Sequence, residues 1–248
     1  MFVKTARFYD ALYAFKDYAA ACERLHALIR RLRPEAATLL DVACGTGVHL
    51  EYLAAHYRVE GLDINSELLA VATGRCPGVT LHHADMTDFE LGSTFDVVTC
   101  LFSSIGYVRT VPGLEAAVAA MARHVAAGGL LVIEPWFTPE QYWVDRLTAN
   151  FTDEPDLKIA WMYVSRRVAD VALLDIHYMA GTPNGIECFT ERHELGLFTD
   201  EQYRAAFGAA GMKVEYDPVG FFGRGAYIAC PAAGGTATKG SASGVEGA

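Results

Sequence analysis

The sequence predicts an α/β fold: a parallel β-sheet flanked by helices, with an antiparallel β layer inserted into it. Three observations support this fold class. Short apolar runs alternate with segments of helical period from about residue 18 to 135, a pattern typical of βαβ units. After Pro135, three β-rich stretches follow one another without intervening helices. The α/β alternation resumes between residues 199 and 230.

Composition bounds the class of protein. The chain has 248 residues, of which 52% are apolar and 20% charged, as expected for one packed domain with an insertion. A net charge of −10 disfavours a protein that holds a nucleic-acid backbone, although a local arginine can still bind one anionic ligand. No apolar run approaches the roughly 18–20 residues of a membrane span, and the N-terminus lacks the features of a secretion signal.

The cysteines and a histidine pair indicate no metal site. The six cysteines are widely spaced, which disfavours structural zinc, and several lie in apolar runs, where cysteine behaves as a small hydrophobic residue. His82 and His83 are adjacent on an expected strand and therefore point to opposite faces. We expect no bound metal and a reducing, cytoplasmic setting.

Apolar spacing defines the elements of the first half. Residues 18–32 place Leu25 and Ile29 on one helical stripe, and Pro34 ends that helix. Strands are expected at residues 38–42, 59–62, 79–82, 95–101 and 130–134. Further helices are expected at 48–56, at 66–75 with Ser66 as its cap, and at 112–125, ended by Gly128 and Gly129.

The second half contains the insertion and the return to the α/β pattern. Short polar turns join the expected β stretches, which predict an antiparallel meander at residues 158–168, 172–181 and 187–198. Thr199 caps a helix that runs to about residue 210, and Gly211 ends it. Strands follow at 213–216 and 226–230. The tail, 232–248, is almost all Gly, Ala, Ser and Thr and is predicted to be disordered.

A glycine-bearing loop after the first strand indicates a ligand site. The segment LLDVACGTG, residues 39–47, ends a strand and opens a helix. Gly45 and Gly47 allow a tight turn and close approach of a ligand, and the N–H groups of the helix start favour an anion. Asp63 ends the next strand, where its carboxylate can accept hydrogen bonds from both hydroxyls of a ribose. The arrangement fits a dinucleotide or a nucleoside.

The absence of a third glycine distinguishes between a dinucleotide and a nucleoside ligand. The dinucleotide fingerprint G-x-G-x-x-G requires glycine at position 50, which is leucine, and counting from position 43 also fails because Ala43 stands there. Asp41 is badly placed beside a diphosphate and well placed to hold an ammonium. A ligand with an ammonium, a carboxylate, a ribose and an adenine satisfies all these groups. The sequence therefore predicts S-adenosylmethionine.

Two further segments at strand ends agree with this ligand. Asp85 and Met86 follow the third strand, where the carboxylate can accept from the adenine amino group and the methionine can pack on the ring. Phe102 and Ser104 follow the fourth strand, at the edge of the same crevice. A turn without function is the alternative for the loop alone, and the successive carboxylates disfavour it.

These motifs resemble those of class I S-adenosylmethionine-dependent methyltransferases over about residues 36–135. Further segments resemble the N,N-dimethyltransferases of nucleotide-linked amino sugars, the makers of desosamine and mycaminose; they are HHADMTDFELG, FSSIGY, EPWF and LFTDEQYRAAFGAAGMKVEY with GRG. That resemblance covers most of residues 16–230. It implies a Rossmann-like sheet with an inserted antiparallel layer, and methyl transfer to a sugar 3-amine in antibiotic biosynthesis.

The resemblance also implies roles for single residues. Tyr107 follows FSSIG, where the family has a histidine or tyrosine near the acceptor amine, and Arg224 in GRG matches an arginine near the nucleotide phosphates. Phe222 stands where the family typically has a serine, and the stretch before KDY is shortened to Ala14 and Phe15. Both departures predict a more apolar pocket mouth.

Methyl transfer from a sulfonium is an in-line displacement, so we expect the protein mainly to position the reactants. Tyr107 is the expected catalytic residue, an orienting hydroxyl and proton acceptor; simple packing against the cofactor is the alternative. Tyr9 and Tyr13 belong to an expected lid that keeps water from the sulfonium. The expected cofactor-binding residues are Tyr9, Tyr18, Asp41, Ala43, Gly45, Gly47, Asp63, Ile64, Asp85, Met86 and Phe102. The expected acceptor-binding residues are Tyr13, Ser104, Trp136, His177 and Arg224.

The favoured function is N-methylation of a small-molecule acceptor such as a thymidine-diphosphate amino sugar. The alternatives are another natural-product acceptor, methylated at N or O, and a non-catalytic module that senses the cofactor. We expect no nucleic-acid or membrane partner, and a homodimer is left open. The expected segments are a lid and helix (1–35), a cofactor-binding core (36–135), an acceptor-side insertion (136–198), a return to the core (199–231) and the tail (232–248).

Overall fold

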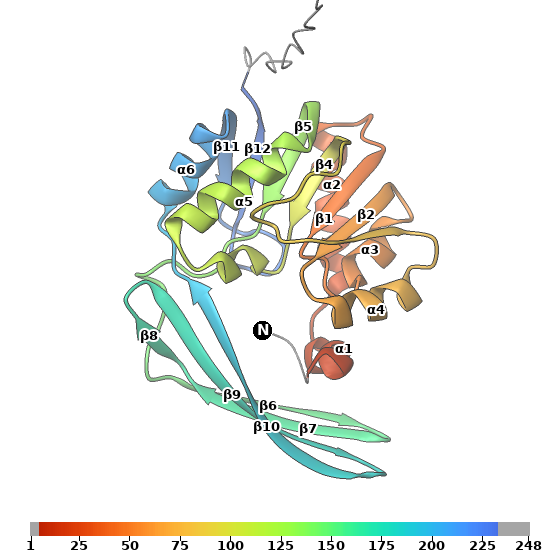
Figure 1. The fold of residues 1–248 in the computed structure, drawn as a ribbon, viewed down its shortest axis with the longest axis vertical. Coiled ribbons are helices and arrows are strands. Elements are labelled where there is room, and N and C mark those ends of the chain that lie inside the picture. The colour runs from red at the N-terminus through yellow and green to blue at the C-terminus, as the bar shows by residue number, and fades with distance from the viewer. Residues whose placement is uncertain (1–4, 233–248) are drawn as a thin grey trace, which may run out of the picture.

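The computed structural model describes residues 5–232. Its core is a seven-stranded sheet in the order β11-β12-β5-β4-β1-β2-β3 (Figure 1). Neighbouring strands from β5 to β3 pair in parallel, whereas β12 is antiparallel to both β5 and β11. The strands are β1 (Thr38–Val42), β2 (Arg58–Asp63), β3 (Thr80–His83), β4 (Phe95–Cys100), β5 (Val125–Ile133), β11 (Met212–Asp217) and β12 (Ala226–Pro231).

Helices cover both faces of this sheet. They are α2 (Tyr18–Leu32), α3 (Val48–Leu53), α4 (Ser66–Arg75), α5 (Val111–Arg123) and α6 (Asp200–Ala209). The first three pack with Leu39 and Val97 in one apolar cluster. α5 and α6 pack with Leu40 and Val98 in another. Because adjacent residues of a strand point to opposite faces, β1 and β4 each contribute to both clusters.

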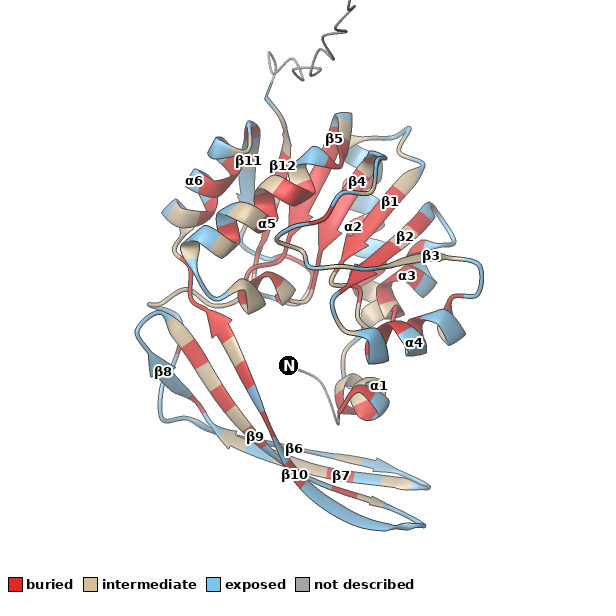
Figure 2. Ribbon diagram, viewed as in Figure 1, coloured by how far each residue is buried: buried red, intermediate tan, exposed pale blue. Residues whose placement is uncertain are grey.

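The predicted antiparallel insertion forms a separate sheet, the inserted layer, with strand order β10-β9-β7-β6 and β8 paired to β9. Its strands are β6 (Leu147–Glu154), β7 (Leu157–Val164), β8 (Arg166–Val168), β9 (Val171–Thr182) and β10 (Gly185–Gly196). Burial alternates along β9, so one face of the layer is covered and the other is open (Figure 2). No strand was predicted where β6 lies. The predicted stretch at residues 158–168 covers two strands of the structure, β7 and β8.

The N-terminal segment, residues 5–13, lies between the two sheets (Figure 1). It consists of the 3-10 helix η1 (Ala6–Phe8) and the short helix α1 (Tyr9–Tyr13), and we call it the lid segment. Phe8 and Leu12 bury their side chains in the apolar cluster of the inserted layer. The lid segment therefore contacts the part of the chain that we expected to bind the acceptor.

Some predicted boundaries are wrong. Asn65, not Ser66, caps α4, because its side chain accepts the first backbone N–H groups of the helix. Gly128 and Gly129 do not end α5; they lie inside β5, beside a register shift against β4. α3 ends at Leu53, earlier than predicted. By contrast, α2 has the predicted bounds, and Thr199 caps α6 as predicted.

Residues 233–248, nearly all of the tail predicted to be disordered, lie outside the described residues, so that prediction remains a prediction. Within residues 5–232, no helix is long and apolar enough to cross a membrane.

Candidate functional site

A cavity of about 340 Å³ opens where the carboxyl ends of β1, β2 and β3 meet. The loops that follow these strands form its walls, as their spacing in the sequence predicts. We call it the cofactor cavity. The expected cofactor-binding residues that line it are Tyr9, Ala43, Gly45, Asp63, Ile64, Asp85 and Met86.

The glycine loop, residues 43–47, makes its turn with left-handed residues. The angle φ is +60° at Ala43, +57° at Gly45 and +77° at Gly47. Gly47 is the N-cap of α3, and a Cβ there would lie 3.1 Å from the Cβ of Ala72 in α4. Gly47 therefore lets the loop pack against α4, and unlike Gly45 it does not line the cofactor cavity.

Asp63 is held at the cavity wall by backbone N–H groups. Its Oδ2 accepts from the N–H of Gly45 at 2.9 Å and its Oδ1 accepts from the N–H of Asn65 at 2.8 Å. Burial raises the pKa of the carboxyl, and these hydrogen bonds oppose that rise. Each carboxylate oxygen can accept more than one hydrogen bond, so both ribose hydroxyls can still donate to Asp63. The side chains present thus fit the nucleoside part of S-adenosylmethionine.

Asp41 lies deeper than predicted. Its side chain accepts a hydrogen bond from the Thr99 hydroxyl at 2.7 Å, the residue is only 1% exposed, and it does not line the cofactor cavity. Burial raises the pKa of Asp41 to about 7. Asp41 is therefore not positioned at the cavity wall for the predicted direct contact with a ligand ammonium; its side chain is held against β4 by Thr99.

The buried Asp41 carboxyl makes stability depend on pH. Its pKa is higher in the folded chain than the ordinary value near 4, so the folded state binds the proton more tightly and the free energy of unfolding falls as pH rises from about 4 to 7. In Asp41→Asn, we expect the loss of unfolding free energy between about pH 5 and pH 8 to shrink by on the order of 2 kcal/mol. Urea denaturation of both proteins checks this, and an unchanged pH dependence would contradict the raised pKa.

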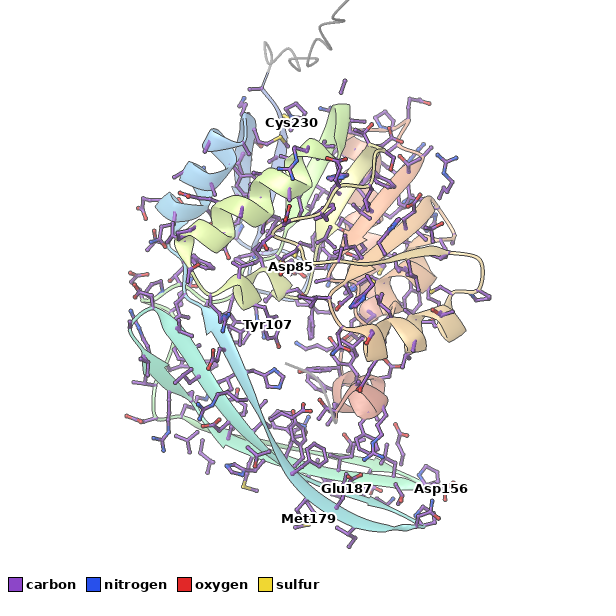
Figure 3. All side chains as sticks on the ribbon, viewed as in Figure 1. Asp85, Tyr107, Asp156, Met179, Glu187 and Cys230 are labelled. Carbon is purple, nitrogen blue, oxygen red and sulfur yellow. The ribbon has the colours of Figure 1, made fainter. Side chains whose placement is uncertain are left out.

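The remaining predicted cofactor residues lie at two places. Asp85 stands at the cavity wall, where its Oδ1 accepts from both the N–H and the hydroxyl of Thr87 at 2.8 Å (Figure 3). Tyr18 and Phe102 line a smaller neighbouring cavity of about 20 Å³, together with Gly45.

A second cavity, of about 310 Å³, lies between the core and the inserted layer, and we call it the acceptor cavity. It shares Tyr9, Ser104 and Tyr107 with the cofactor cavity, so the two cavities meet at these residues. Tyr13 and Trp136 line it as predicted, and residues of β7, β9 and β10 complete its walls. The predicted lid and the predicted insertion thus enclose one space.

Tyr107 lies at the junction and hydrogen-bonds to a histidine of the inserted layer. Its hydroxyl is 2.9 Å from Nδ1 of His193, and the carboxylate of Glu191 lies 4.0 Å from Nε2 of the same ring. Burial raises the pKa of Tyr107 well above its ordinary value and lowers that of His193 to about 4. Phenol and imidazole are therefore both neutral near pH 7, and Tyr107 is not a phenolate base.

Arg224 and Lys16 place two cations over aromatic rings at the acceptor cavity. The Arg224 guanidinium lies 4.6 Å from the centre of the Trp136 ring and donates to the Ser103 hydroxyl at 2.9 Å. The Lys16 ammonium lies 5.6 Å from the Phe102 ring, and burial together with Arg224 lowers its pKa. Aromatic rings therefore hold both cations at the acceptor cavity, where an anionic group of a ligand can contact them.

The acceptor cavity includes residues that are not among the expected acceptor-binding residues, and one expected residue lies elsewhere. Lys16, Trp161 and His193 line the acceptor cavity, whereas His177, predicted to do so, does not. His177 is exposed and hydrogen-bonds Thr190 on the open face of the inserted layer. Strand alternation could have found this, because buried residues flank the exposed His177 on both sides along β9.

Buried Glu134 joins the two loops that carry Phe102 and Arg224. Its Oε2 accepts from the N–H of Phe102 at 2.8 Å, and its Oε1 accepts from the N–H groups of Phe221 and Phe222 at 3.1 and 3.2 Å. Burial raises the pKa of this carboxyl, and these hydrogen bonds oppose the rise. Glu134, at the end of β5, thereby fixes both loops at the junction of the cavities.

The parallel sheet, the glycine loop and the strand-end carboxylates define a class I S-adenosylmethionine-dependent methyltransferase, and a methyltransferase-domain family matches residues 39–129. A dTDP-3-amino-3,6-dideoxy-α-D-glucopyranose N,N-dimethyltransferase of Streptomyces fradiae is 42% identical over 234 residues, which are 93% of this chain and 92% of that protein. The chain therefore belongs to the family of dTDP-amino-sugar N,N-dimethyltransferases, and its cofactor is S-adenosylmethionine.

Solved structures agree with this assignment. The crystal structure of Streptomyces venezuelae DesVI matches with a TM-score of 0.89 at 39% identity, covering 94% of this chain and 100% of that one. CalS10 of Micromonospora echinaspora, an amino pentose methyltransferase solved with S-adenosylmethionine bound, matches with a TM-score of 0.83 at 40% identity, covering 92% and 97%.

Proposed function

We propose that the chain methylates the amine of a nucleotide-linked amino sugar, with thymidine diphosphate as the nucleotide. The observation that carries this proposal is the meeting of the two cavities at Tyr9, Ser104 and Tyr107. An amine held on one side of that junction can align with a methyl group held on the other. The names of the relatives support the acceptor class, and the cations Lys16 and Arg224 support a diphosphate at the acceptor cavity.

S-adenosylmethionine supplies a methyl group on a sulfonium, and its sulfide leaves without needing a proton. The chain's own part is to hold the amine in line and exclude water, an effect that can reach roughly 7–11 kcal/mol. The carboxylate of Glu191 favours a proton on Nε2 of His193, which leaves Nδ1 to accept from the Tyr107 hydroxyl. The Tyr107 oxygen can then accept a hydrogen bond from the amine N–H and turn the amine lone pair toward the methyl group.

Removing the Tyr107 hydroxyl tests this positioning. We expect Tyr107→Phe to lower kcat about tenfold, the effect of one hydrogen bond of about 1.4 kcal/mol, with the KM for S-adenosylmethionine unchanged. Steady-state assays with a dTDP-amino sugar measure both. Tyr142→Phe is the matched control, because the Tyr142 hydroxyl donates to Arg166 O within the inserted layer and does not line the acceptor cavity. If kcat of the Tyr107 variant stays within a factor of two, Tyr107 only packs against the ligands.

Phe222, an apolar residue where the family typically has a serine, does not lie at the pocket mouth as predicted. Phe222 does not line the acceptor cavity; its ring packs 5.2 Å from that of Phe102 and 5.4 Å from the Lys16 ammonium. Phe15 does line the cavity and is 60% exposed. The replacement at Phe222 therefore does not argue against a nucleotide-sugar acceptor.

A turnover assay separates the acceptor classes. Purified chain and S-adenosylmethionine are mixed with a dTDP-3-amino sugar, a dTDP-4-amino sugar, or the same amino sugars without nucleotide, and products are followed by mass spectrometry. We expect methylated product from a nucleotide-linked sugar and little from the free sugars. Equal turnover with and without nucleotide would overturn the nucleotide part of the proposal and favour another small-molecule acceptor.

We also propose a homodimer and a cytoplasmic setting. The open face of the inserted layer carries Met179 (Figure 3). Phe151 and Met162 are also exposed apolar residues of this layer, and such a patch suits a two-fold symmetric contact. The six cysteines, all within the described residues, are free thiols, which suits a reducing compartment. Light scattering tests the dimer: a monomeric mass at micromolar concentration would contradict it.

A further inference from the structure

The lid segment touches both cavities. Tyr9 lines the cofactor cavity and the acceptor cavity, and Tyr13 lines the acceptor cavity. Both lie on α1, which also carries Asp10, and Asp10 lines neither cavity. The position of α1 therefore decides whether the two tyrosines cover the ligands, and any contact that fixes α1 acts on both cavities.

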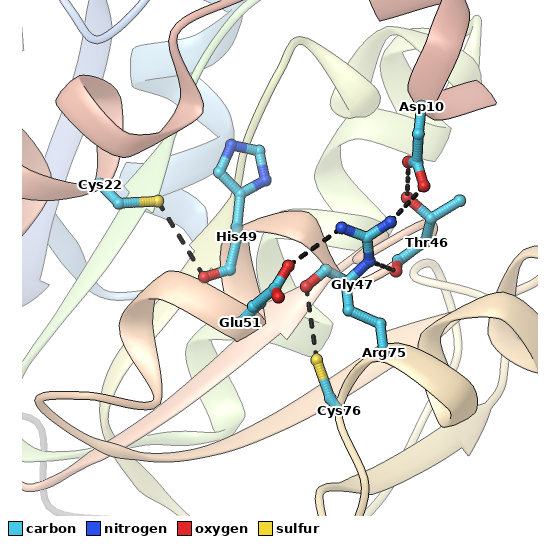
Figure 4. Close-up of polar contacts among 8 residues, drawn as sticks. All are labelled: Asp10, Cys22, Thr46, Gly47, His49, Glu51, Arg75 and Cys76. Carbon is cyan, nitrogen blue, oxygen red and sulfur yellow. Dashed lines mark hydrogen bonds and ion pairs between the residues drawn. The ribbon is translucent and has the colours of Figure 1, made fainter. Parts of the chain in front are cut away.

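Asp10 joins the lid segment to the glycine loop (Figure 4). Its Oδ1 accepts a hydrogen bond from the hydroxyl of Thr46, between the two loop glycines, at 2.7 Å. Its Oδ2 pairs with the guanidinium of Arg75, the last residue of α4. Nε of Arg75 donates to the backbone O of Thr46 at 2.9 Å, so the three residues close a ring of contacts.

The other side of the lid segment is attached to the inserted layer. The N–H and the hydroxyl of Thr5 both donate to the carboxylate of Glu191, and Arg7 pairs with Glu187. Thr152 of β6 donates to the backbone O of Ala11 at 3.2 Å. The segment thus bridges the inserted layer and the core, and Asp10 attaches it to the glycine loop.

We propose that Asp10 is a positioning residue for the cofactor: with Thr46 and Arg75 it forms a latch that holds the lid segment closed over the cofactor cavity. The latch opens each time S-adenosylhomocysteine leaves and S-adenosylmethionine enters. It is built from groups on three separate elements, and one of them is the loop that the cofactor itself contacts. This inference rests on the cofactor assigned above and is independent of which acceptor the chain methylates.

The first test measures release of S-adenosylhomocysteine from the full chain without acceptor, by stopped-flow displacement. We expect Asp10→Asn and Arg75→Met each to raise the dissociation rate about three- to tenfold, since the latch combines a charged pair with a charge-assisted hydrogen bond. The double variant is expected to be no faster than the faster single variant by more than about twofold, because the first change already opens the latch.

Glu51→Gln is the matched control. Glu51 pairs with the same guanidinium at 3.0 Å but lies on α3, not on the lid segment, so its loss is expected to leave the dissociation rate within twofold (Figure 4). Hydrogen exchange of a peptide covering residues 6–13 provides a second measurement on ligand-free protein. Exchange is expected to rise in Asp10→Asn and to stay unchanged in Glu51→Gln.

The outcomes separate the latch from the function. Faster ligand release and faster exchange in the Asp10 and Arg75 variants, with neither in the Glu51 variant, supports the latch. Unchanged release and unchanged exchange in Asp10→Asn would overturn it, as would an equal effect of Glu51→Gln. Failure of the unaltered chain to bind S-adenosylhomocysteine would contradict the function instead, and the exchange measurement would still decide on the latch.

Discussion

Replacing Asp63 with alanine is expected to weaken binding of S-adenosylhomocysteine by about 1–3 kcal/mol, because a ribose loses its hydrogen-bond acceptors inside the cofactor cavity. The change also removes the groups to which Gly45 N–H and Asn65 N–H donate, so the glycine loop loses its fixed position. Both effects act on the cofactor and leave the acceptor cavity intact. Isothermal titration of the variant and the unaltered chain measures the difference.

A variant on the same strand controls for damage to the sheet. Glu60→Gln lies on β2, where Glu60 contacts His82 at 2.7 Å, outside the cofactor cavity. We expect it to bind S-adenosylhomocysteine as the unaltered chain does. Asp63→Asn, which keeps one acceptor oxygen, should fall between alanine and aspartate. Unchanged binding by Asp63→Ala would remove this residue from the site.

Replacing Arg224 with alanine is expected to raise the KM for a dTDP-amino sugar by about 10- to 100-fold, since a charge-assisted contact to phosphate is lost in a partly buried place. The KM for S-adenosylmethionine should change little, because Arg224 lines the acceptor cavity and not the cofactor cavity. The difference between variant and unaltered chain should narrow at high salt, which screens the lost attraction. Steady-state kinetics at two salt concentrations measure this.

Two comparisons sharpen the result. Arg224→Lys keeps the charge and loses the planar group that stacks on Trp136, so it should restore only part of the acceptor affinity. Arg204→Ala removes an exposed arginine that pairs with Asp200 on α6, and should have no effect on either KM. Equal increases in both KM values for Arg224→Ala would mean that this arginine only supports the structure.

The cofactor half of the site could be predicted because its information is local. Gly45, Asp63 and Asp85 each follow a short apolar strand, and parallel strands bring their carboxyl ends to one edge of a sheet. Asp41 lies inside the first strand, and its side chain is buried against β4 instead of lining the cofactor cavity. Depth below the surface depends on packing against β4, and no spacing rule reports it.

The acceptor half was harder to predict because the inserted layer and the lid form its walls. β6 went unpredicted since its sequence, LTANFTDE, is polar and owes its strand to pairing with β7. His177 and His193 both lie in predicted strands. Alternation with apolar neighbours places His177 on the open face, whereas the pairing of β10 with β9 places His193 toward the cavity. The contacts of Asp10 with Thr46 and Arg75 join residues far apart in the chain, and nothing local predicts them.

We propose that the cofactor cavity holds S-adenosylmethionine while the adjoining acceptor cavity holds a nucleotide-linked amino sugar. Calorimetric titration tests it most directly: S-adenosylhomocysteine is added to saturation, and a dTDP-amino sugar is then titrated in. We expect one site for each ligand, with the second ligand binding while the first stays bound. Displacement of S-adenosylhomocysteine by the sugar nucleotide, or no binding of any dTDP-amino sugar, would contradict it.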